Sequence, residues 1–121
     1  MKTCLIVDDS RVIRHVTRGF MEKLGFSVEE ADSGLTALES CRRAMPETIL
    51  LDWNMPVMDG MTFLVNLREM PRGRQPKVLF CTTENDIGRM SRALEAGADE
   101  FVMKPFDQHI LSEKLAQVGA L

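Results

Sequence analysis

Leu5-Ile6-Val7-Asp8-Asp9, at residues 5–9, is a short apolar run that stops abruptly on two aspartates. The same pattern returns three times further along the chain: Ile49-Leu50-Leu51 before Asp52, Val78-Leu79-Phe80-Cys81 before Thr82, and Phe101-Val102-Met103 before Lys104. Continuous apolar runs separated by helix-like segments are typical of buried strands in a parallel sheet. Ligands bind beyond the carboxyl ends of such strands, so we expect these polar residues to meet at one edge of the sheet.

The segments between the runs carry apolar residues at helical spacing and complete five βα units. Residues 26–31 alternate between apolar and polar and are expected to form the second strand, after 3–7 and before those at 48–51, 78–81 and 100–103. Right-handed crossovers then predict an α/β fold, a doubly wound parallel sheet with helices on both faces. The inward residues expected of the five helices are Ile13, Val16, Phe20 and Leu24; Leu38, Cys41 and Met45; Phe63, Leu64 and Leu67; Ile87, Met90 and Leu94; and Leu111, Leu115 and Val118.

Composition narrows the class of protein. The 121 residues suit a single domain, 1–121, and the net charge of -3 offers no basic footprint for nucleic acid. No apolar stretch approaches the roughly 20 residues that span a bilayer, and no signal-peptide core precedes Asp8. We therefore expect a soluble, cytoplasmic protein without nucleic-acid or membrane partners.

The three cysteines, Cys4, Cys41 and Cys81, are far apart and predict reduced thiols rather than a disulfide framework or a zinc site.

The chemistry of the strand ends favours a metal-assisted phosphoryl site. Asp8, Asp9 and Asp52 would repel one another without a cation, and an all-oxygen shell suits Mg²⁺. With the metal bound, Asp52 is a credible nucleophile toward a phosphoryl group, whose oxygens Lys104 and Thr82 can hold. Neither GxGxxG nor GxxxxGK[ST] occurs in the chain, so a glycine-rich phosphate loop is not predicted.

A single aspartate after a strand is more often a helix cap or turn former, and Asp9 alone would be read as the cap of the first helix. The complementary groups at all four runs favour the functional interpretation for Asp8, Asp9 and Asp52. The remaining aspartates that lie in turns or helix starts are given a structural role: Asp32, Asp59, Asp86, Asp99 and Asp107.

Across its whole length the chain resembles response-regulator receiver domains, specifically the single-domain CheY-like type that acts in chemotaxis. The motifs that carry the resemblance are Asp8-Asp9, LLDWNMPVMDG around Asp52, CTTE around Thr82, and Lys104-Pro105-Phe106. The resemblance implies a flavodoxin-like (βα)5 sheet with strand order 2-1-3-4-5. It also implies a cis Lys104-Pro105 bond.

The resemblance makes Asp52 the phosphoacceptor, charged by a histidine kinase or a histidine phosphotransfer protein of a two-component system. It implies that Asp9 and Asp52 bind Mg²⁺ directly, Asp8 through water, and Asn54 through its backbone carbonyl. Lys104 and Thr82 hold the phosphoryl group in this family.

Four further positions are interpreted through the family. Thr82 and Phe101 are the switch pair, Phe101 standing where tyrosine is more usual. Asn54 and Glu84 form the pair that favours quick self-dephosphorylation. Thr83 replaces a commonly small residue and is expected to restrict access to the phosphoryl group.

The resemblance implies a monomeric binding switch rather than an enzyme, with self-dephosphorylation as its only turnover. Its expected output surface spans the fourth helix, the fifth strand and the fifth helix, with Arg89, Arg92, Phe101 and Lys114 as members. We expect no output domain, so an unidentified separate protein would receive the signal. The alternative from another class is a Mg²⁺-dependent aspartate-nucleophile phosphohydrolase of the haloacid-dehalogenase type. A flavodoxin-like electron carrier is disfavoured, because aspartates replace the phosphate-binding loop that such a protein carries after its first strand.

Overall fold

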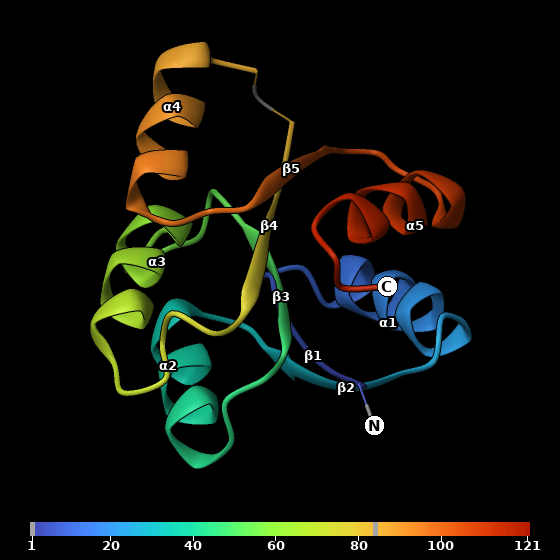
Figure 1. The fold of residues 1–121 in the computed structure, drawn as a ribbon, viewed down its shortest axis with the longest axis horizontal. Coiled ribbons are helices and arrows are strands. Elements are labelled where there is room, and N and C mark those ends of the chain that lie inside the picture. The colour runs from blue at the N-terminus through green and yellow to red at the C-terminus, as the bar shows by residue number, and fades with distance from the viewer. Residues whose placement is uncertain (1, 84) are drawn as a thin grey trace.

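The computed structural model describes residues 2–83 and 85–121, which alternate strictly between strands and helices (Figure 1). The elements follow in the order β1 (Lys2–Val7), α1 (Arg11–Lys23), β2 (Phe26–Ala31), α2 (Gly34–Arg43), β3 (Thr48–Asp52), α3 (Gly60–Glu69), β4 (Lys77–Thr82), α4 (Ile87–Ala96), β5 (Glu100–Met103) and α5 (Gln108–Gln117). The predicted five βα units are confirmed.

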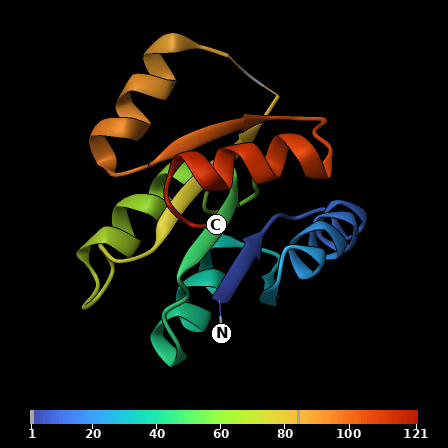
Figure 2. The same ribbon diagram turned by 45° about the vertical axis from the view of Figure 1, so that its right-hand side comes forward.

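The five strands form one parallel sheet in the order β2-β1-β3-β4-β5, as predicted. Helices α1 and α5 cover one face, and α2, α3 and α4 cover the other, as two views of the ribbon show (Figures 1 and 2). Val7 pairs with Leu51 and Asp52 with Cys81, so β1, β3 and β4 end at the same edge. This register brings the polar strand ends together.

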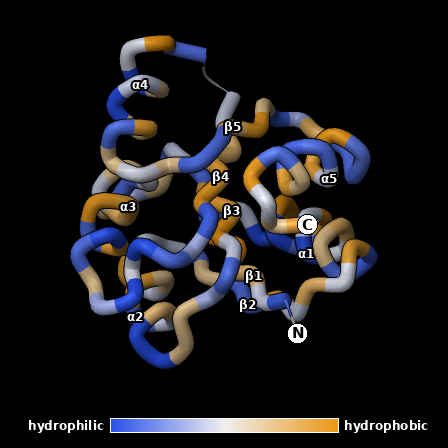
Figure 3. The backbone as a smooth tube through the Cα atoms, in the orientation of Figure 1, coloured by the Kyte–Doolittle hydropathy of each residue, from blue (hydrophilic) through white to orange (hydrophobic). Residues whose placement is uncertain are grey.

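Alternation along the strands supplies a core on each face of the sheet. Leu5, Val7 and Leu51 point into the core under α2, α3 and α4, whereas Ile6 and Leu50 point into the one under α1 and α5. The most hydrophobic parts of the chain accordingly lie at the centre, in β3 and β4 (Figure 3). Both faces of the sheet are buried, which explains why the strands read as continuous apolar runs.

Each helix begins on a residue whose side chain accepts a hydrogen bond from a backbone N–H in the first turn. Ser33, Asp59, Asp86 and Asp107 cap α2, α3, α4 and α5 in this way. Ser10, not Asp9, caps α1. Asp9 therefore has no capping role that would compete with a functional one.

The predicted inward face of α1 is partly wrong. Ile13 and Val16 are 37% and 48% exposed, whereas Thr17 and Met21 are buried against the sheet. Rotating α1 in this way lets Arg14 and Arg18 reach Glu30 on β2, with N–O distances of 2.9 and 2.6 Å. Ile13 and Val16 then face the segment after β5 instead of the core.

The inward face of α4 is also partly wrong. Ile87 is 82% and Leu94 is 50% exposed, and Ala93 is the residue of α4 that is fully buried. Met90 packs against the core but is only partly covered. Because Ala93 is small, the buried face of α4 is narrower than the spacing of its apolar residues suggests.

The cysteines are free and buried, as expected for packing residues. Burial raises the pKa of the Cys41 thiol to about 11. Among the described residues, no helix has the length and apolar character needed to cross a membrane.

Candidate functional site

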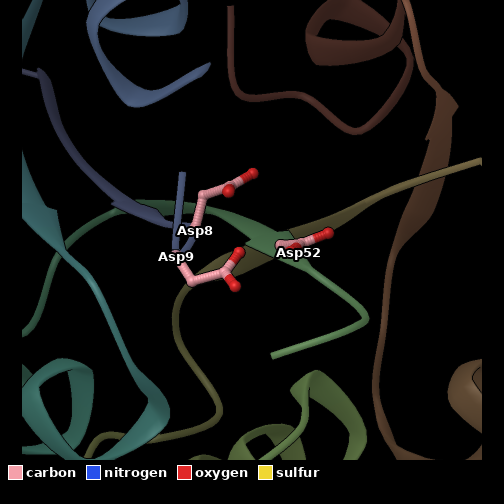
Figure 4. A group of neighbouring side chains, drawn as sticks. All are labelled: Asp8, Asp9 and Asp52. Atoms are coloured by element: carbon pink, nitrogen blue, oxygen red, sulfur yellow. The ribbon is translucent and has the colours of Figure 1, made fainter. Parts of the chain in front are cut away.

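Three carboxylates converge where β1 and β3 end (Figure 4). Asp8 and Asp9 follow the last residue of β1, and Asp52 is the last residue of β3. One carboxylate oxygen from each of the three lies within 4.8 Å of the other two. Asp8 is buried, Asp52 is half-buried and Asp9 is exposed, so the cluster has an inner wall and a face open to solvent. The predicted acidic group therefore assembles as expected.

Lys104 completes the cluster from the end of β5. Its Nζ donates to Asp8 Oδ2 at 2.8 Å and to Asp52 Oδ1 at 3.0 Å. Its backbone N–H donates to the carbonyl of Thr82 at 2.8 Å, which ties the start of this loop to β4. The Lys104–Pro105 peptide bond is cis, as predicted.

Asp8 is held by its own turn. Its Oδ1 accepts a hydrogen bond from the backbone N–H of Ser10 at 2.8 Å, while Oδ2 accepts from Lys104. Its backbone N–H donates to the carbonyl of Ala31 on β2, and its carbonyl accepts from Arg14. Both carboxylate oxygens of Asp8 thus already accept hydrogen bonds. The arrangement does not favour Asp8 as a bidentate metal ligand.

The electrostatics of the cluster call for a further cation. Burial raises the pKa of Asp52, the hydrogen bond and charge of Lys104 oppose this rise, and the carboxylates of Asp8 and Asp9 add to it. Burial acts to lower the pKa of Lys104, but the two carboxylates outweigh it and the pKa is raised. One ammonium faces three carboxylates, and an all-oxygen donor set with excess negative charge fits Mg²⁺.

The other predicted site residues lie around this cluster. Thr82 is 2% exposed at the end of β4, and Thr83 is exposed beside it. Asn54 is exposed in the loop after β3. Glu84, the expected partner of Asn54, lies outside the described residues.

Sequence reasoning missed Gly60 as a site residue. Its N–H donates to the carbonyl of Trp53 at 2.9 Å, and a Cβ at this position would collide with the carbonyl oxygen of Asp52 and lie 2.7 Å from the Phe80 ring. The start of α3 can pack this closely behind Asp52 only because residue 60 has no side chain. The Asp59-Gly60 pair indicated a turn in the sequence but not this close approach.

The residues expected on the output surface divide between surface and interior. Arg92 is exposed, and Lys114 lies 3.9 Å from Glu100. Phe101 is only 6% exposed, because its ring stacks at 6.0 Å on Phe80 and 6.3 Å on Trp53. In this structure Phe101 belongs to the core and not to the surface.

The guanidinium of Arg89 lies 4.6 Å from the centre of the Trp53 ring. Trp53 in turn packs at 4.5 Å against Phe80. The residue next to Asp52 therefore links an aromatic cluster in the core to the first turn of α4. Nothing in the sequence spacing indicated this contact, since residues 53 and 89 meet only in the fold.

An apolar groove of about 370 Å³ opens on the opposite side of the site, between α1 and the segment after β5. Lys104 and the exposed Thr83 also line it. The apolar side chains that line it are Val12, Ile13, Val16, Phe20, Pro105 and Phe106.

Comparison with known proteins identifies the family of this fold. The sequence model of the response regulator receiver domain matches residues 4–116, and the chain belongs to this family. It is 36% identical over 115 residues to the chemotaxis protein CheY-3 of Vibrio cholerae serotype O1, which covers 94% of this chain and 88% of that protein. It is 34% identical over 116 residues to the chemotaxis protein CheY1 of Helicobacter pylori, with 94% of each covered.

A solved structure of the chemotaxis protein CheY4 of Vibrio cholerae superposes with a TM-score of 0.93 at 32% identity, covering 98% of both chains. A putative response regulator from Chloroflexus aurantiacus gives a TM-score of 0.90 at 28% identity, covering 99% of this chain and 98% of that one. The chain is thus a CheY-like receiver domain with the flavodoxin-like fold.

Proposed function

We propose that this protein is a response regulator of a two-component system, in which Asp52 accepts a phosphoryl group and thereby switches binding to a partner protein. The observation that carries the proposal is the group formed by Asp8, Asp9 and Asp52 with the ammonium of Lys104 between two of them. The phosphodonor would be a histidine kinase or a histidine phosphotransfer protein. Relatives of nearly the same length that are named chemotaxis proteins support a chemotaxis-type role.

Mg²⁺ would be held by Asp9 and Asp52 directly, with the backbone carbonyl of Asn54 as a further oxygen. Asp8 would act through a water molecule, because Ser10 and Lys104 already occupy its two carboxylate oxygens. Bound Mg²⁺ supplies charge neutralisation for the phosphoryl oxygens.

In the transfer step, a carboxylate oxygen of Asp52 attacks phosphorus, an O–P bond forms, and the P–N bond to the donor histidine breaks. The imidazole leaves with the electron pair of that bond and is neutralised by a proton. Lys104 starts on Asp52 Oδ1 and is close enough to move onto a phosphoryl oxygen, while the hydroxyl of Thr82 can donate to another. The phosphorylated residue carries a charge of about −1.5 to −2 in place of the −1 of the carboxylate, and this change in charge and size at one strand end is the signal.

The apolar groove beside Lys104 supports a docking position for the donor protein. Val12 and Val16 are 73% and 48% exposed in its wall. A donor helix that buried these side chains would carry its phosphohistidine toward the acidic cluster. Apolar burial of this kind supplies affinity without changing the charge balance of the site.

The test is phosphorylation by acetyl phosphate in Mg²⁺, followed by intact mass and by the fluorescence of Trp53, the single tryptophan. We expect a mass gain of one phosphoryl group and a change in fluorescence, both lost in Asp52→Asn. Asp32→Asn, which alters an exposed aspartate outside the cluster, is the matched control and retains both. A wild-type protein that gains no phosphoryl group, or that instead turns over phosphate monoesters, would contradict the proposal.

A further inference from the structure

Phe101 occupies the interior of the structure, where it is only 6% exposed. Its ring stacks nearly parallel to Phe80, with an interplanar angle of 13°, and also lies against Trp53. The side chain has no hydroxyl that would gain from water, and aromatic rings at these separations attract one another. Phe101 therefore has little reason to leave the core, and movement of this ring is a poor candidate for the readout of Asp52.

Thr82 lines a crevice too small to admit a water molecule, whose other walls are Trp53, Asp86, Arg89 and Met90. If Thr82 moved toward a phosphoryl group on Asp52, its departure would leave a void. A void loses packing contacts and therefore costs free energy, so we expect a neighbouring side chain or helix to move and fill it. Because Phe101 is already inside, the walls that can respond are Trp53 and the first turn of α4.

Among the described residues, the first turn of α4 places little apolar surface in the core. Ile87 is exposed to solvent, and Ala93, further along, is the fully buried side chain of α4. Arg89 lies in the first turn, where its backbone N–H donates to the capping carboxylate of Asp86 at 3.2 Å. Its guanidinium over Trp53 is thus one contact that fixes the start of α4 to the core.

We propose that Arg89 is a positioning residue whose cation–π contact with Trp53 latches α4 in the resting state, and that phosphorylation of Asp52 releases this latch. The inference rests on the proposed function only for the identity of the trigger. The latch itself is a contact of the unmodified protein. It assigns to Arg89 and Trp53 the relay between the phosphoacceptor and the surface of α4.

The experiment compares Arg89→Met, Arg89→Lys and Arg92→Met. Methionine keeps the unbranched aliphatic stem and removes the charge, and Arg92 is an exposed arginine of the same helix. Without any phosphodonor, acrylamide should quench Trp53 more strongly in Arg89→Met than in wild type, while Arg92→Met matches wild type. Arg89→Lys keeps the charge but loses the flat stacking group, so it should fall between the two.

With acetyl phosphate and Mg²⁺, Arg89→Met should become phosphorylated roughly two- to fivefold faster than wild type, the population change that one exposed cation–π contact supports. Equal quenching and equal rates in Arg89→Met and Arg92→Met would overturn the latch. A slower rate in Arg89→Met would overturn it as well. A wild-type protein that takes up no phosphoryl group would refute the proposed function, and the quenching comparison would still decide whether the latch exists.

Discussion

Replacing Val57 should stabilise this protein. Val57 has φ of 69°, in the left-handed region, and the N–H of Met58 donates to the carbonyl of Pro56 at 2.8 Å. This is a γ-turn with a positive φ at its central residue, the strained form of the turn, and a β-branched residue rarely adopts it. The valine side chain is 96% exposed, so packing at position 57 does not offset the strain. What retains the turn is Met58, whose side chain lies against Gly34 of α2.

The size of the effect follows from these contacts. Left-handed backbone costs an ordinary residue about 1–2 kcal/mol, and asparagine tolerates it better than most. Because almost no apolar area is lost, Val57→Asn should raise the free energy of unfolding by about 1 kcal/mol. For a domain of this size that corresponds to a rise in Tm of about 4 °C.

The assay is urea unfolding followed by Trp53 fluorescence, with thermal unfolding as a second probe. Val12→Asn is the matched control, since Val12 is 73% exposed but lies on helix α1, and it should not stabilise the protein. An unchanged or lower midpoint for Val57→Asn would refute the reasoning that the turn is strained.

Three further perturbations test the site. In EDTA at neutral pH, Asp52→Asn should be more stable than wild type, because a pKa raised in the folded state means that ionising Asp52 disfavours folding. That advantage should shrink as the pH falls through the raised pKa of folded Asp52, and it should vanish below the ordinary aspartate pKa. Mg²⁺ should stabilise wild type selectively, and calorimetry with and without the metal measures both effects. Gly60→Ala should lower the free energy of unfolding by about 1–3 kcal/mol through the collision with the Asp52 carbonyl, and chemical denaturation checks this. Thr83→Ala should speed phosphorylation by acetyl phosphate, since Thr83 is exposed and lines the groove with Lys104, and an unchanged rate would remove its gating role.

The strands and the acidic cluster were predictable because strand ends are local features, whereas the strand order followed from the resemblance to receiver domains. An apolar run that stops on Asp52 carries in its own sequence both the strand and the place where the strand ends. The parallel topology then determines which ends meet. The caps on Asp59 and Asp107 were predictable for the same reason, since each is decided by its immediate neighbours.

Features decided by distant residues were not predictable. Helical spacing identified Ile13 and Val16 as apolar, but it could not distinguish a face that packs on the sheet from one that lines a groove with Phe106. Phe101 was assigned to the surface because its stacking partners Trp53 and Phe80 lie far away in sequence. Valine is not a turn former, so Val57 gave no sign of a positive φ.

Two adjacent residues at the end of β4 connect the two sides of this site. Thr83 lines the apolar groove, and Thr82 lines the narrow crevice that Arg89 also lines. A donor seated in the groove and a shift of α4 would therefore act on the same few backbone bonds. Binding free energies coupled through one element are reciprocal, so a change that releases α4 must also alter the affinity of the groove for its donor. Donor binding to Arg89→Met should accordingly differ from donor binding to Arg92→Met, although neither arginine lines the groove.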